Sequence, residues 1–418
     1  MSKFRVVQLT QEALKVQCKV DDFEEWGAPT LDLPQYQRKE ELQRTTPFSQ
    51  RGSIFWALVE DTGTGDTGDS SLVAGQTLLY CHCESHRFDC AVRRSSGEIE
   101  RGYSHHIGSV FTLPQHRKRG LAKLFLCEVA KQLGQLPGSL LSVLYSDIGP
   151  TYYDKLGWKL HPSKMATLDV AHPFNNKSSA AELESLTLAD NFDSFLQADN
   201  ARLVKELSSD RFEGQEAFVI LPTRVSIEWQ FCIGVYFARV RHYEELPSRC
   251  GVKIDEDAFI IWCHNLKAST LNLVRARLPE GGKNAAETTR LLLNEALKEA
   301  RKFRLKKITI WDPPSILADA EVRSQFEIQF VEREDSLSSA MVFRHGGDLS
   351  DLSLSFLYAM EKFRLVQLTQ ETLKVQCKAD DHEHWGAPLL TVEQWQHKDE
   401  AQRVTPFSQA GALYWALV

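Results

Sequence analysis

The beginning of this chain occurs twice. The segment from Met1 to Val59 aligns without a gap with the segment from Met360 to Val418, and about two residues in three are identical. A repeat spaced by most of a chain is not a solenoid, whose periods are about 20–50 residues. We therefore expect residues 1–359 to form the functional unit. Residues 360–418 are expected to be a truncated repeat of residues 1–59 without a function of its own.

Composition excludes several classes of partner. The 418 residues are 43% hydrophobic and 25% charged, as in an ordinary globular protein. A net charge of −7 gives no reason to expect nucleic acid or an anionic membrane as a partner. No apolar run is long enough for a membrane span, and the N-terminus lacks the apolar core of a signal peptide. Cys81 and Cys83 form a close pair, but no second pair follows at zinc spacing. We expect reduced cysteines, no metal and a cytoplasmic location.

Strands and helices alternate through residues 1–172. Hydrophobic periodicity predicts strands at 4–9, 53–61, 72–88, 102–114 and 140–147, and helices at 11–25, 34–45, 119–135 and 150–157. This order favours an α/β fold with a mixed sheet covered by helices. The polar, aperiodic segment 172–182 is the predicted linker.

A second α/β domain is predicted over residues 183–350. Its expected strands lie near 226–240, 258–263, 270–278 and 307–311, with a helix near 286–303. The order of strand, glycine loop, helix and strand from 270 to 311 mirrors that of residues 108–146. We therefore expect the second domain to be a degenerate version of the first.

A basic loop opens the helix predicted at 119–135. The strand SVFTLP runs into Arg117-Lys118-Arg119-Gly120-Leu121-Ala122. Free amide groups and the helix dipole make such a helix start attractive to anions, and glycine allows a phosphate to approach the backbone. The arrangement suits a pyrophosphate. Taken alone, a solvated basic helix start explains these six residues equally well.

The loop and the later segment LYSDIGPTYYDKLGWK together resemble the GNAT superfamily of acetyltransferases. That family has a Q/R-x-x-G-x-G/A phosphate loop, here with Ala122 in the last position, and a tyrosine helix that ends in Leu-Gly-aromatic. The resemblance implies acetyl-CoA as co-substrate, with its pyrophosphate held by the backbone amides of Arg117, Lys118, Arg119, Gly120, Leu121 and Ala122. It implies that Val110, Phe111 and Thr112 pair with the pantetheine arm. It also implies that Tyr153 is the general acid, with Tyr152 as the alternative. The purely structural alternative is that either tyrosine is an ordinary ring of the hydrophobic core.

The segments CESHRFDCAV, SVLYSDIG and AFIIWCHNLKASTLNLVRARL resemble the fungal lysine N6-acetyltransferases of lysine catabolism. This resemblance implies a small-molecule amine as the acceptor, most simply free L-lysine. An ammonium group must lose a proton before it can attack, so a base is expected, and Glu84 and His106 are the candidates. Both residues have an ordinary structural explanation as well. Further acceptor-site candidates are Trp262, His264, Arg275 and Arg277, the arginines as partners for a substrate carboxylate. A protein or peptide N-acetyltransferase and a non-catalytic CoA-binding protein are the alternatives.

Overall fold

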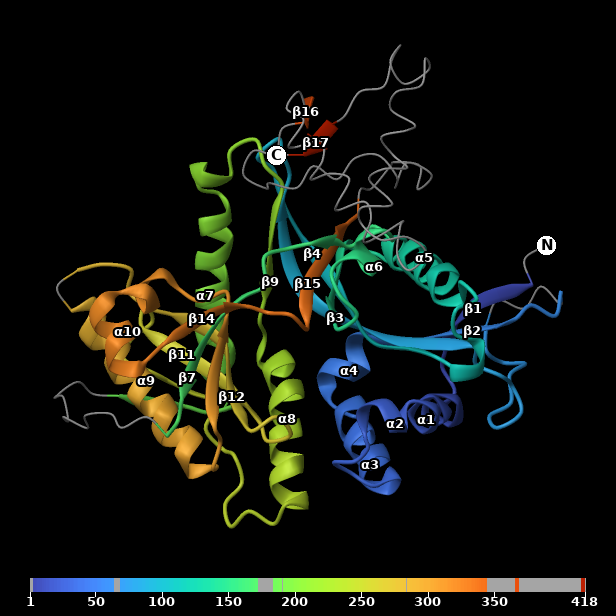
Figure 1. Ribbon diagram of the computed structural model, residues 1–418, viewed down its shortest axis with the longest axis horizontal. Coiled ribbons are helices and arrows are strands. Elements are labelled where there is room, and N and C mark those ends of the chain that lie inside the picture. Colours follow the sequence, from blue (N-terminus) through green and yellow to red (C-terminus); the bar gives the residue numbers. More distant parts are fainter. Residues whose placement is uncertain are drawn as a thin grey trace, which may run out of the picture. The chain divides into compact units, whose positions relative to one another are not determined.

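Two mixed β-sheets with helices on their faces make up the first of two structural units (Figure 1). The computed structural model describes residues 3–63, 68–171, 183–189, 191–282 and 284–343, and the backbone of residues 365–367 and 415–417. The first unit is Met1–Phe356 and the second is Leu357–Val418. Each unit is described by itself.

The first sheet has eight strands in the order β1-β2-β3-β4-β5-β15-β6, with β9 paired to β3. The strand bounds are β1 Phe4–Leu9, β2 Ser53–Glu60, β3 Cys81–Arg93, β4 Ile99–Thr112, β5 Ser139–Ser146, β6 Lys159–Leu160, β9 Ala217–Leu221 and β15 Leu337–Val342. β4 and β5 are parallel, whereas the other pairs are antiparallel. Helix α5 (Leu121–Gly134) packs on one face through Phe125, Val129 and Leu133. The other face carries α1 (Glu12–Asp21), with α2 (Phe23–Trp26), α3 (Leu33–Arg44) and α4 (Pro47–Gly52) beside it (Figure 1).

The second sheet has seven strands in the order β14-β7-β13-β12-β11-β10-β8. The bounds are β7 Lys164–Asp169, β8 Glu184–Leu186, β10 Gly251–Lys253, β11 Phe259–Asn265, β12 Thr270–Arg277, β13 Lys307–Trp311 and β14 Gln329–Glu332. Its helices are α7 Asn191–Leu207, α8 Arg224–Val240, α9 Ala285–Lys302 and α10 Ala320–Phe326. β12 and β13 are parallel and joined through α9, as β4 and β5 are joined through α5. The predicted degenerate repetition of the first domain's topology is therefore confirmed.

The strand predicted at 226–240 is wrong, because these residues form helix α8. The helix begins with a capping box in which Thr223 and Ser226 exchange side-chain to backbone hydrogen bonds of 3.2 and 2.9 Å. Ile227, Phe231 and Gly234 are buried at helical spacing. The many aromatic and β-branched residues favour a strand locally, but burial against β11 and the N-terminal cap select the helix.

The two sheets exchange strands. β15, near the end of the first unit, lies between β5 and β6 of the first sheet, and β9 also joins that sheet. In the opposite direction, β7 precedes the predicted linker but pairs with β13 and β14 of the second sheet. The linker 172–182 itself lies outside the described residues. The division into domains at 1–172 and 183–350 stays a prediction, and it does not separate the two sheets.

The second start of the chain repeats one pairing of the first. β16 (Leu365–Gln367) and β17 (Trp415–Leu417) are antiparallel, with Val366 opposite Ala416. The matching residues of the first copy, Val7 and Ala57, are likewise opposite each other in β1 and β2. The remainder of 360–418 lies outside the described residues, so the predicted lack of function in this segment stays a prediction.

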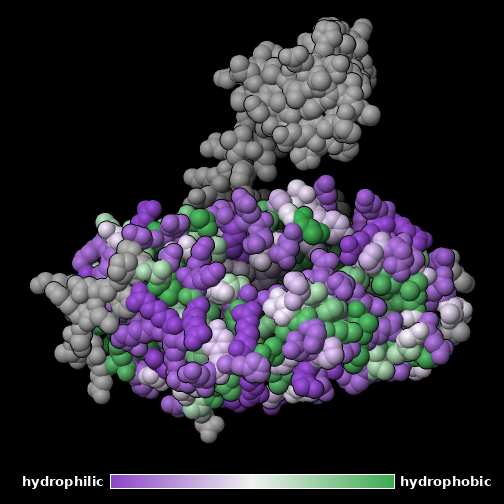
Figure 2. Space-filling view, turned by 60° about the horizontal axis from the view of Figure 1, so that its bottom comes forward, coloured by the Kyte–Doolittle hydropathy of each residue, from purple (hydrophilic) through white to green (hydrophobic). Residues whose placement is uncertain are grey.

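Within the described part of the chain, every helix is too short or too polar to cross a membrane. Figure 2 shows one face of the molecule, on which hydrophilic side chains predominate and hydrophobic residues gather in smaller groups.

Candidate active site

The first sheet opens between its two parallel strands. β4 pairs with β5 as far as Ile107 opposite Leu144. Two residues further, Ser109 has a positive φ of 52°, and the register between β3 and β4 shifts at the same place. An extra residue of this kind is a β-bulge, which bends a strand and ends its pairing. A notch therefore separates β4 from β5 beyond Ile107.

The three residues predicted to pair with pantetheine lie at this notch. Val110, Phe111 and Thr112 follow the bulge, on the part of β4 that has parted from β5. Phe111 and Thr112 still pair with β3 on their other side. The backbone edge that faces the notch is therefore available to an extended ligand, as strand addition requires. Their role as pantetheine-binding residues stays a prediction.

The predicted phosphate loop has the geometry of an anion site. A turn at Pro114–His116 leads from β4 into the loop, and α5 begins at Leu121. Gly120 is the N-cap with a φ of 75°, and a Cβ added there would meet no other atom within 4 Å. Lys118 also has a positive φ, of 61°. Amide groups of the first helical turn thus face open space beside an exposed basic loop, which fits a pyrophosphate.

Two arginine side chains brace this loop. The Arg117 Nε donates a hydrogen bond of 3.0 Å to the Thr112 carbonyl, and Arg119 Nη1 lies 2.7 Å from His116 Nδ1. Both side chains stay exposed, so the guanidinium groups still add positive charge at the loop. The predicted role of the backbone amides from Arg117 to Ala122 in holding the pyrophosphate stays a prediction.

Tyr153 lies on the α5 face of the first sheet. It belongs to α6 (Thr151–Asp154) and is buried in a cluster with Leu121, Phe125 and Trp158. Burial raises the pKa of its hydroxyl well above the ordinary value, with a smaller contribution from Tyr152. The hydroxyl is therefore protonated at neutral pH, as a proton donor must be. Tyr152 is less buried and packs edge-on against Tyr153 at 5.2 Å between ring centroids.

Glu84 lies on the opposite face, and it is paired. The Lys19 ammonium, which is 2% exposed, contacts the Glu84 carboxylate and lies 3.3 Å from Glu40 and 3.5 Å from Asp22. Burial opposes the charge on Lys19, but Glu84, Glu40 and Asp22 together raise its pKa well above the ordinary value. Lys19 is therefore a permanent counter-ion of Glu84, so this carboxylate is not free to act alone.

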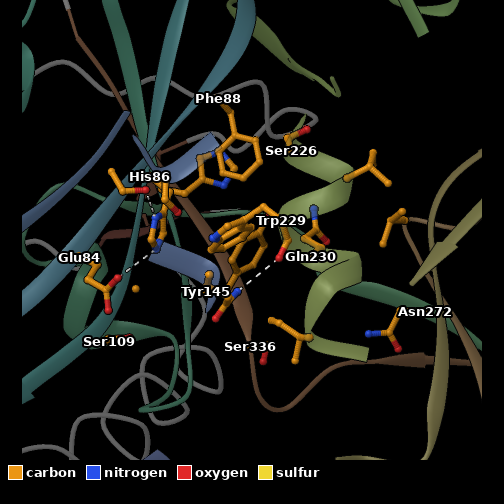
Figure 3. A pocket seen from close by; sticks show the side chains of 18 of the residues that line it. Glu84, His86, Phe88, Ser109, Tyr145, Ser226, Trp229, Gln230, Asn272 and Ser336 are labelled. Atoms are coloured by element: carbon orange, nitrogen blue, oxygen red, sulfur yellow. Dashed lines mark hydrogen bonds and ion pairs between the residues drawn. The ribbon is translucent and has the colours of Figure 1, made fainter. Parts of the chain in front are cut away.

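A histidine adjoins Glu84 in the same wall. His86 Nε2 lies 3.8 Å from Glu84, and its Nδ1 lies 2.8 Å from Ser53 Oγ (Figure 3). Burial lowers the pKa of His86, while Glu84 raises it in part. A neutral imidazole held in this way can accept a proton. The predicted base His106 also lines the wall, but burial lowers its pKa to about 3. That makes His106 a weaker proton acceptor than the sequence led us to expect.

These residues surround one cavity of about 830 Å³. Figure 3 shows side chains that project into it from both halves of the first unit. The first half contributes Glu84, His86, Phe88, His106, Gly108, Ser109 and Tyr145, and the second half contributes Trp229, Gln230, Asn272, Thr309 and Trp311. Gly108 and Ser109 connect the cavity to the notch. Glu84 is part of the cavity wall, whereas Tyr153 lies in the core cluster on the α5 face of the sheet and does not line the cavity.

Several sequence-predicted residues do not reach this cavity. Trp262 is buried and donates a 3.0 Å hydrogen bond to the Arg249 carbonyl. The His264 ring is buried 3.0 Å from Glu299. Neither side chain is part of the cavity wall, so the expectation that they shape the acceptor pocket is wrong. Both side chains are buried on β11 of the second sheet, so they contribute to the core of that half.

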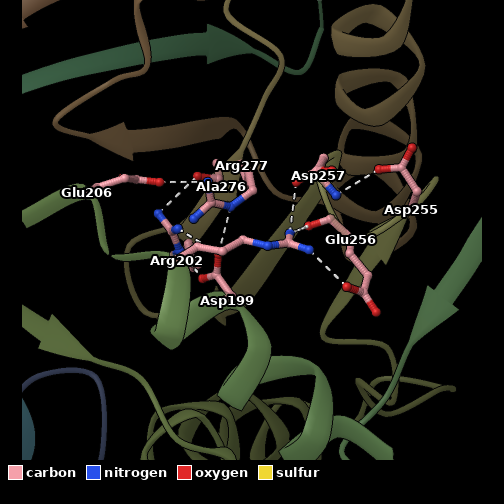
Figure 4. Close-up of polar contacts among 9 residues, drawn as sticks. Asp199, Arg202, Glu206, Asp255, Glu256, Asp257, Ala276 and Arg277 are labelled. Carbon is pink, nitrogen blue, oxygen red and sulfur yellow. Dashed lines mark hydrogen bonds and ion pairs between the residues drawn. The ribbon is translucent and has the colours of Figure 1, made fainter. Parts of the chain in front are cut away.

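The two candidate arginines are already paired. Arg275 makes two hydrogen bonds of 2.7 and 2.9 Å to Asp199. Arg277 binds the same carboxylate at 2.7 Å and Glu206 at 2.8 Å (Figure 4). Arg275 borders the cavity, but its guanidinium is committed to α7. The arginines therefore stabilise the packing of α7 on β12, and a substrate carboxylate needs another cation.

Sequence reasoning missed three wall residues, namely His86, Tyr145 and Trp229. It also missed Lys19, which contacts the wall residue Glu84. Residues 84, 86 and 88 are two apart on β3 and therefore share one face of the strand, so the segment CESHRF could have predicted that His86 lies beside Glu84. The same alternation of faces along β5 could have predicted the side of the sheet on which Tyr145 lies. Lys19 and Trp229 are brought in by helices from distant parts of the chain, and no local pattern marks them. Across the described residues, no group of three or more His, Cys, Asp or Glu is arranged to hold a metal ion.

Comparison with known proteins supports the same chemistry. Residues 169–359 match the family described as LYC1 GNAT-like C-terminal domain. The chain is 23% identical over 335 residues to a lysine acetyltransferase of Yarrowia lipolytica, which covers 69% of this chain and 79% of the relative. It is 24% identical over 332 residues to the uncharacterized protein YGR111W of Saccharomyces cerevisiae, with 68% and 77% covered.

Solved structures with a similar arrangement include a GCN5-related N-acetyltransferase from Kribbella flavida. It has a TM-score of 0.45 and 14% identity, and the match covers 81% of this chain and 72% of that one. A probable N-acyltransferase from Enterococcus faecalis has a TM-score of 0.46 and 12% identity, with 82% and 73% covered.

Proposed function

Since this chain is a GNAT N-acetyltransferase, we propose that it transfers the acetyl group of acetyl-CoA to the ε-amine of free L-lysine. The carrying observation is the cavity that joins the notch of the first sheet to walls from both halves. The lysine acetyltransferase of Yarrowia lipolytica supports the choice of amine. Localisation in the cytoplasm and a place in lysine catabolism stay predictions.

The contribution of both halves of the first unit to the cavity wall favours a small acceptor over a protein. Helix α8 contributes Trp229 and Gln230, and β12 and β13 contribute Asn272, Thr309 and Trp311 to its wall. A volume of about 830 Å³ lies in the usual range for small-molecule sites, about 300–1,000 Å³. A protein N-terminus or an internal lysine would need an open groove across this wall. Peptide acetylation is therefore the second candidate and not the first.

Binding of the co-substrate is assigned to the first sheet and α5. The amides from Arg117 to Ala122 would hold the pyrophosphate, and the edge of Val110–Thr112 would hold the pantetheine arm. Acetyl-CoA supplies an activated acyl group as a thioester. An amide at the bulge near Ser109 would polarise its carbonyl, which is the usual way to stabilise an oxyanion.

Proton transfer needs one acceptor and one donor. The ε-ammonium of lysine has a pKa of about 10.4, so a base must remove a proton before attack. His86 beside Glu84 would accept it. The neutral amine nitrogen then bonds to the acetyl carbon as the carbon–sulfur bond breaks, and it releases its second proton to solvent, from which Tyr153 is later reprotonated. Tyr153 would protonate the departing thiolate from the other side of the notch.

The test is a turnover assay of the full chain with acetyl-CoA and either free L-lysine or a lysine-containing peptide with blocked termini. CoA release and the mass of the acetylated product are measured for each acceptor. We expect turnover with free lysine at least tenfold more efficient than with the peptide. Turnover with the peptide alone would overturn the small-substrate proposal, and turnover with neither would overturn both.

A further inference from the structure

Free lysine would bring a carboxylate into the cavity along with its amine. A carboxylate in a partly enclosed site requires a cationic or hydrogen-bonding partner. Four cationic residues line the cavity, namely Lys39, Arg44, Lys267 and Arg275. Arg275 is held by Asp199, and the Nε of Arg44 donates to Glu12 at 2.8 Å. Both guanidinium groups are therefore committed within the protein.

Lys267 differs from the other three. It lies in the turn between β11 and β12, at the exposed rim of the cavity. Its ammonium donates a 2.8 Å hydrogen bond to the carbonyl of Trp26 in α2. Among the described residues, no carboxylate lies within ion-pair distance of this ammonium. Lys267 thus carries an uncompensated charge at the place where a ligand would enter.

Lys39 faces the same rim from α3. Burial lowers the pKa of Lys267, and the nearby Lys39 lowers it further. Two ammonium groups from the two halves of the unit therefore repel each other across the cavity wall. A bound anion would relieve this repulsion, whereas an empty site would not.

A chain of charges separates this rim from Glu84 and His86, where the amine of lysine would lie. Lys39 lies 2.5 Å from Glu40, and Glu40 lies 3.3 Å from Lys19. Lys19 contacts Glu84, which lies 3.8 Å from His86. The cavity wall thus carries the positive charge of Lys267 at the rim, beside the Lys39–Glu40 ion pair, and a carboxylate and a neutral imidazole near the notch. L-lysine has the matching polarity, with a carboxylate at one end and an ammonium at the other.

We infer that Lys267, assisted by Lys39, binds the α-carboxylate of the amino-acid substrate and so selects an amino acid over a plain amine. This inference rests on the proposed function, because it presumes that free lysine is the acceptor. It assigns Lys267 to substrate specificity and leaves the proton transfers to residues at the notch.

The experiment compares L-lysine with 1,5-diaminopentane, which has the same amine but lacks the carboxylate. The measured quantity is the ratio of kcat/KM for lysine to that for the diamine, in the full chain and in Lys267→Met. We expect this ratio to fall at least tenfold, mainly through a higher KM for lysine. Lys267→Arg should restore most of the ratio, because it keeps the positive charge. Lys298→Met is the matched control, since Lys298 is exposed on α9 and pairs with Glu295.

The outcomes separate the two ideas. A wild-type enzyme that prefers lysine to the diamine, with a ratio unchanged in Lys267→Met, would overturn the assignment of Lys267 and leave the proposed function standing. Equal use of lysine and the diamine by the wild type would show that the carboxylate is not recognised at all. If the wild type acetylates neither compound, the proposed function fails and the inference falls with it.

Discussion

At the scale of single residues, the first sheet contains three buried histidines whose pKa values are lowered. His82, His105 and His106 lie on β3 and β4, and burial lowers their pKa values to about 3, about 4 and about 3. His82 is 2% exposed and packs against Phe111, with 5.2 Å between ring centroids. All three rings are neutral at neutral pH, so the folded state opposes their protonation.

The stability of the protein should therefore depend on pH through His82. Its folded pKa lies below the unfolded value of 6.5, so the unfolded chain binds more protons below pH 6.5 and stability falls as the pH drops. Between pH 7 and 5 this one group should cost about 2 kcal/mol. In His82→Gln, the loss of unfolding free energy between these two pH values should be smaller by that amount. Urea unfolding at both pH values measures it, and an unchanged loss would contradict the buried, neutral state of His82.

Residue identities near the notch were readable from sequence, but their partners were not. Tyr153 was singled out by the tyrosine-helix motif, and Glu84 by its position near the centre of a predicted strand; their catalytic roles stay predictions. The counter-ion of Glu84 comes from Lys19 in α1, and the free cation Lys267 comes from a turn in the second half. Such contacts depend on the tertiary structure, which local patterns do not encode. Arg275 shows the converse error, since its pairing with Asp199 removes a charge that the sequence offered to the substrate.

At the scale of elements, the loop before α5 combines two positive φ angles with an uncovered helix start. Gly120 can adopt its φ of 75° without strain because it has no Cβ. Motif order predicted this strand, loop and helix within two or three residues. The bulge at Ser109 was not predicted, because a serine with left-handed backbone leaves no mark in hydrophobic periodicity. The prediction of a strand at 226–240, where the structure has α8, was wrong for a related reason. The aromatic and β-branched side chains there favour a strand, whereas the spacing of the buried residues is that of a helix.

Substitution of Gly120 tests the loop. Gly120→Ala and Gly120→Glu should both be destabilised by about 1 kcal/mol, because a Cβ is strained at this φ. Only Gly120→Glu places a negative charge where the pyrophosphate is expected. Its Kd for acetyl-CoA should rise at least tenfold above that of Gly120→Ala, or about 1.4 kcal/mol. Titration calorimetry of both variants measures the difference, and equal affinities would remove the pyrophosphate from this loop.

At the scale of the whole molecule, the exchange of β7, β9 and β15 ties the two halves of the first unit together. The active-site cavity draws its wall from both halves, so its shape depends on this exchange. Sequence patterns predicted two α/β regions of similar order, and that organisation is present. They could not predict which sheet each strand joins, because pairing between strands far apart in sequence depends on the tertiary structure and not on local patterns.

Truncation separates the role of β15 from that of the second start. A chain cut after Arg333 lacks β15 and loses the burial of Leu337, Met341 and Val342. Each such side chain stabilises by about 1.5–3 kcal/mol, so the total approaches the whole stability of a domain, about 5–15 kcal/mol. We expect this chain to be insoluble or to melt without cooperativity.

A chain cut after Ala359 keeps β15 and is the matched control. It should melt cooperatively, with kcat and KM within about twofold of the full chain, well under the 1.4 kcal/mol of a tenfold change. Calorimetry and the turnover assay measure both truncations. Cooperative melting of the shorter chain would deny β15 its structural role. Lost activity in a folded longer chain would show that residues 360–418 are a working part of the enzyme.

The position of β15 also sets the order of events while the chain is being made. One edge of β5, which ends at Ser146, pairs with β15, which ends only at Val342. A ribosome adds about 5–20 residues per second, so this edge stays open for roughly 10–40 s after β5 has emerged. During that interval an unpaired strand invites pairing with other nascent chains. The first sheet can close only after nearly the whole catalytic unit has been synthesised, so the enzyme acquires its site in one late step and not domain by domain.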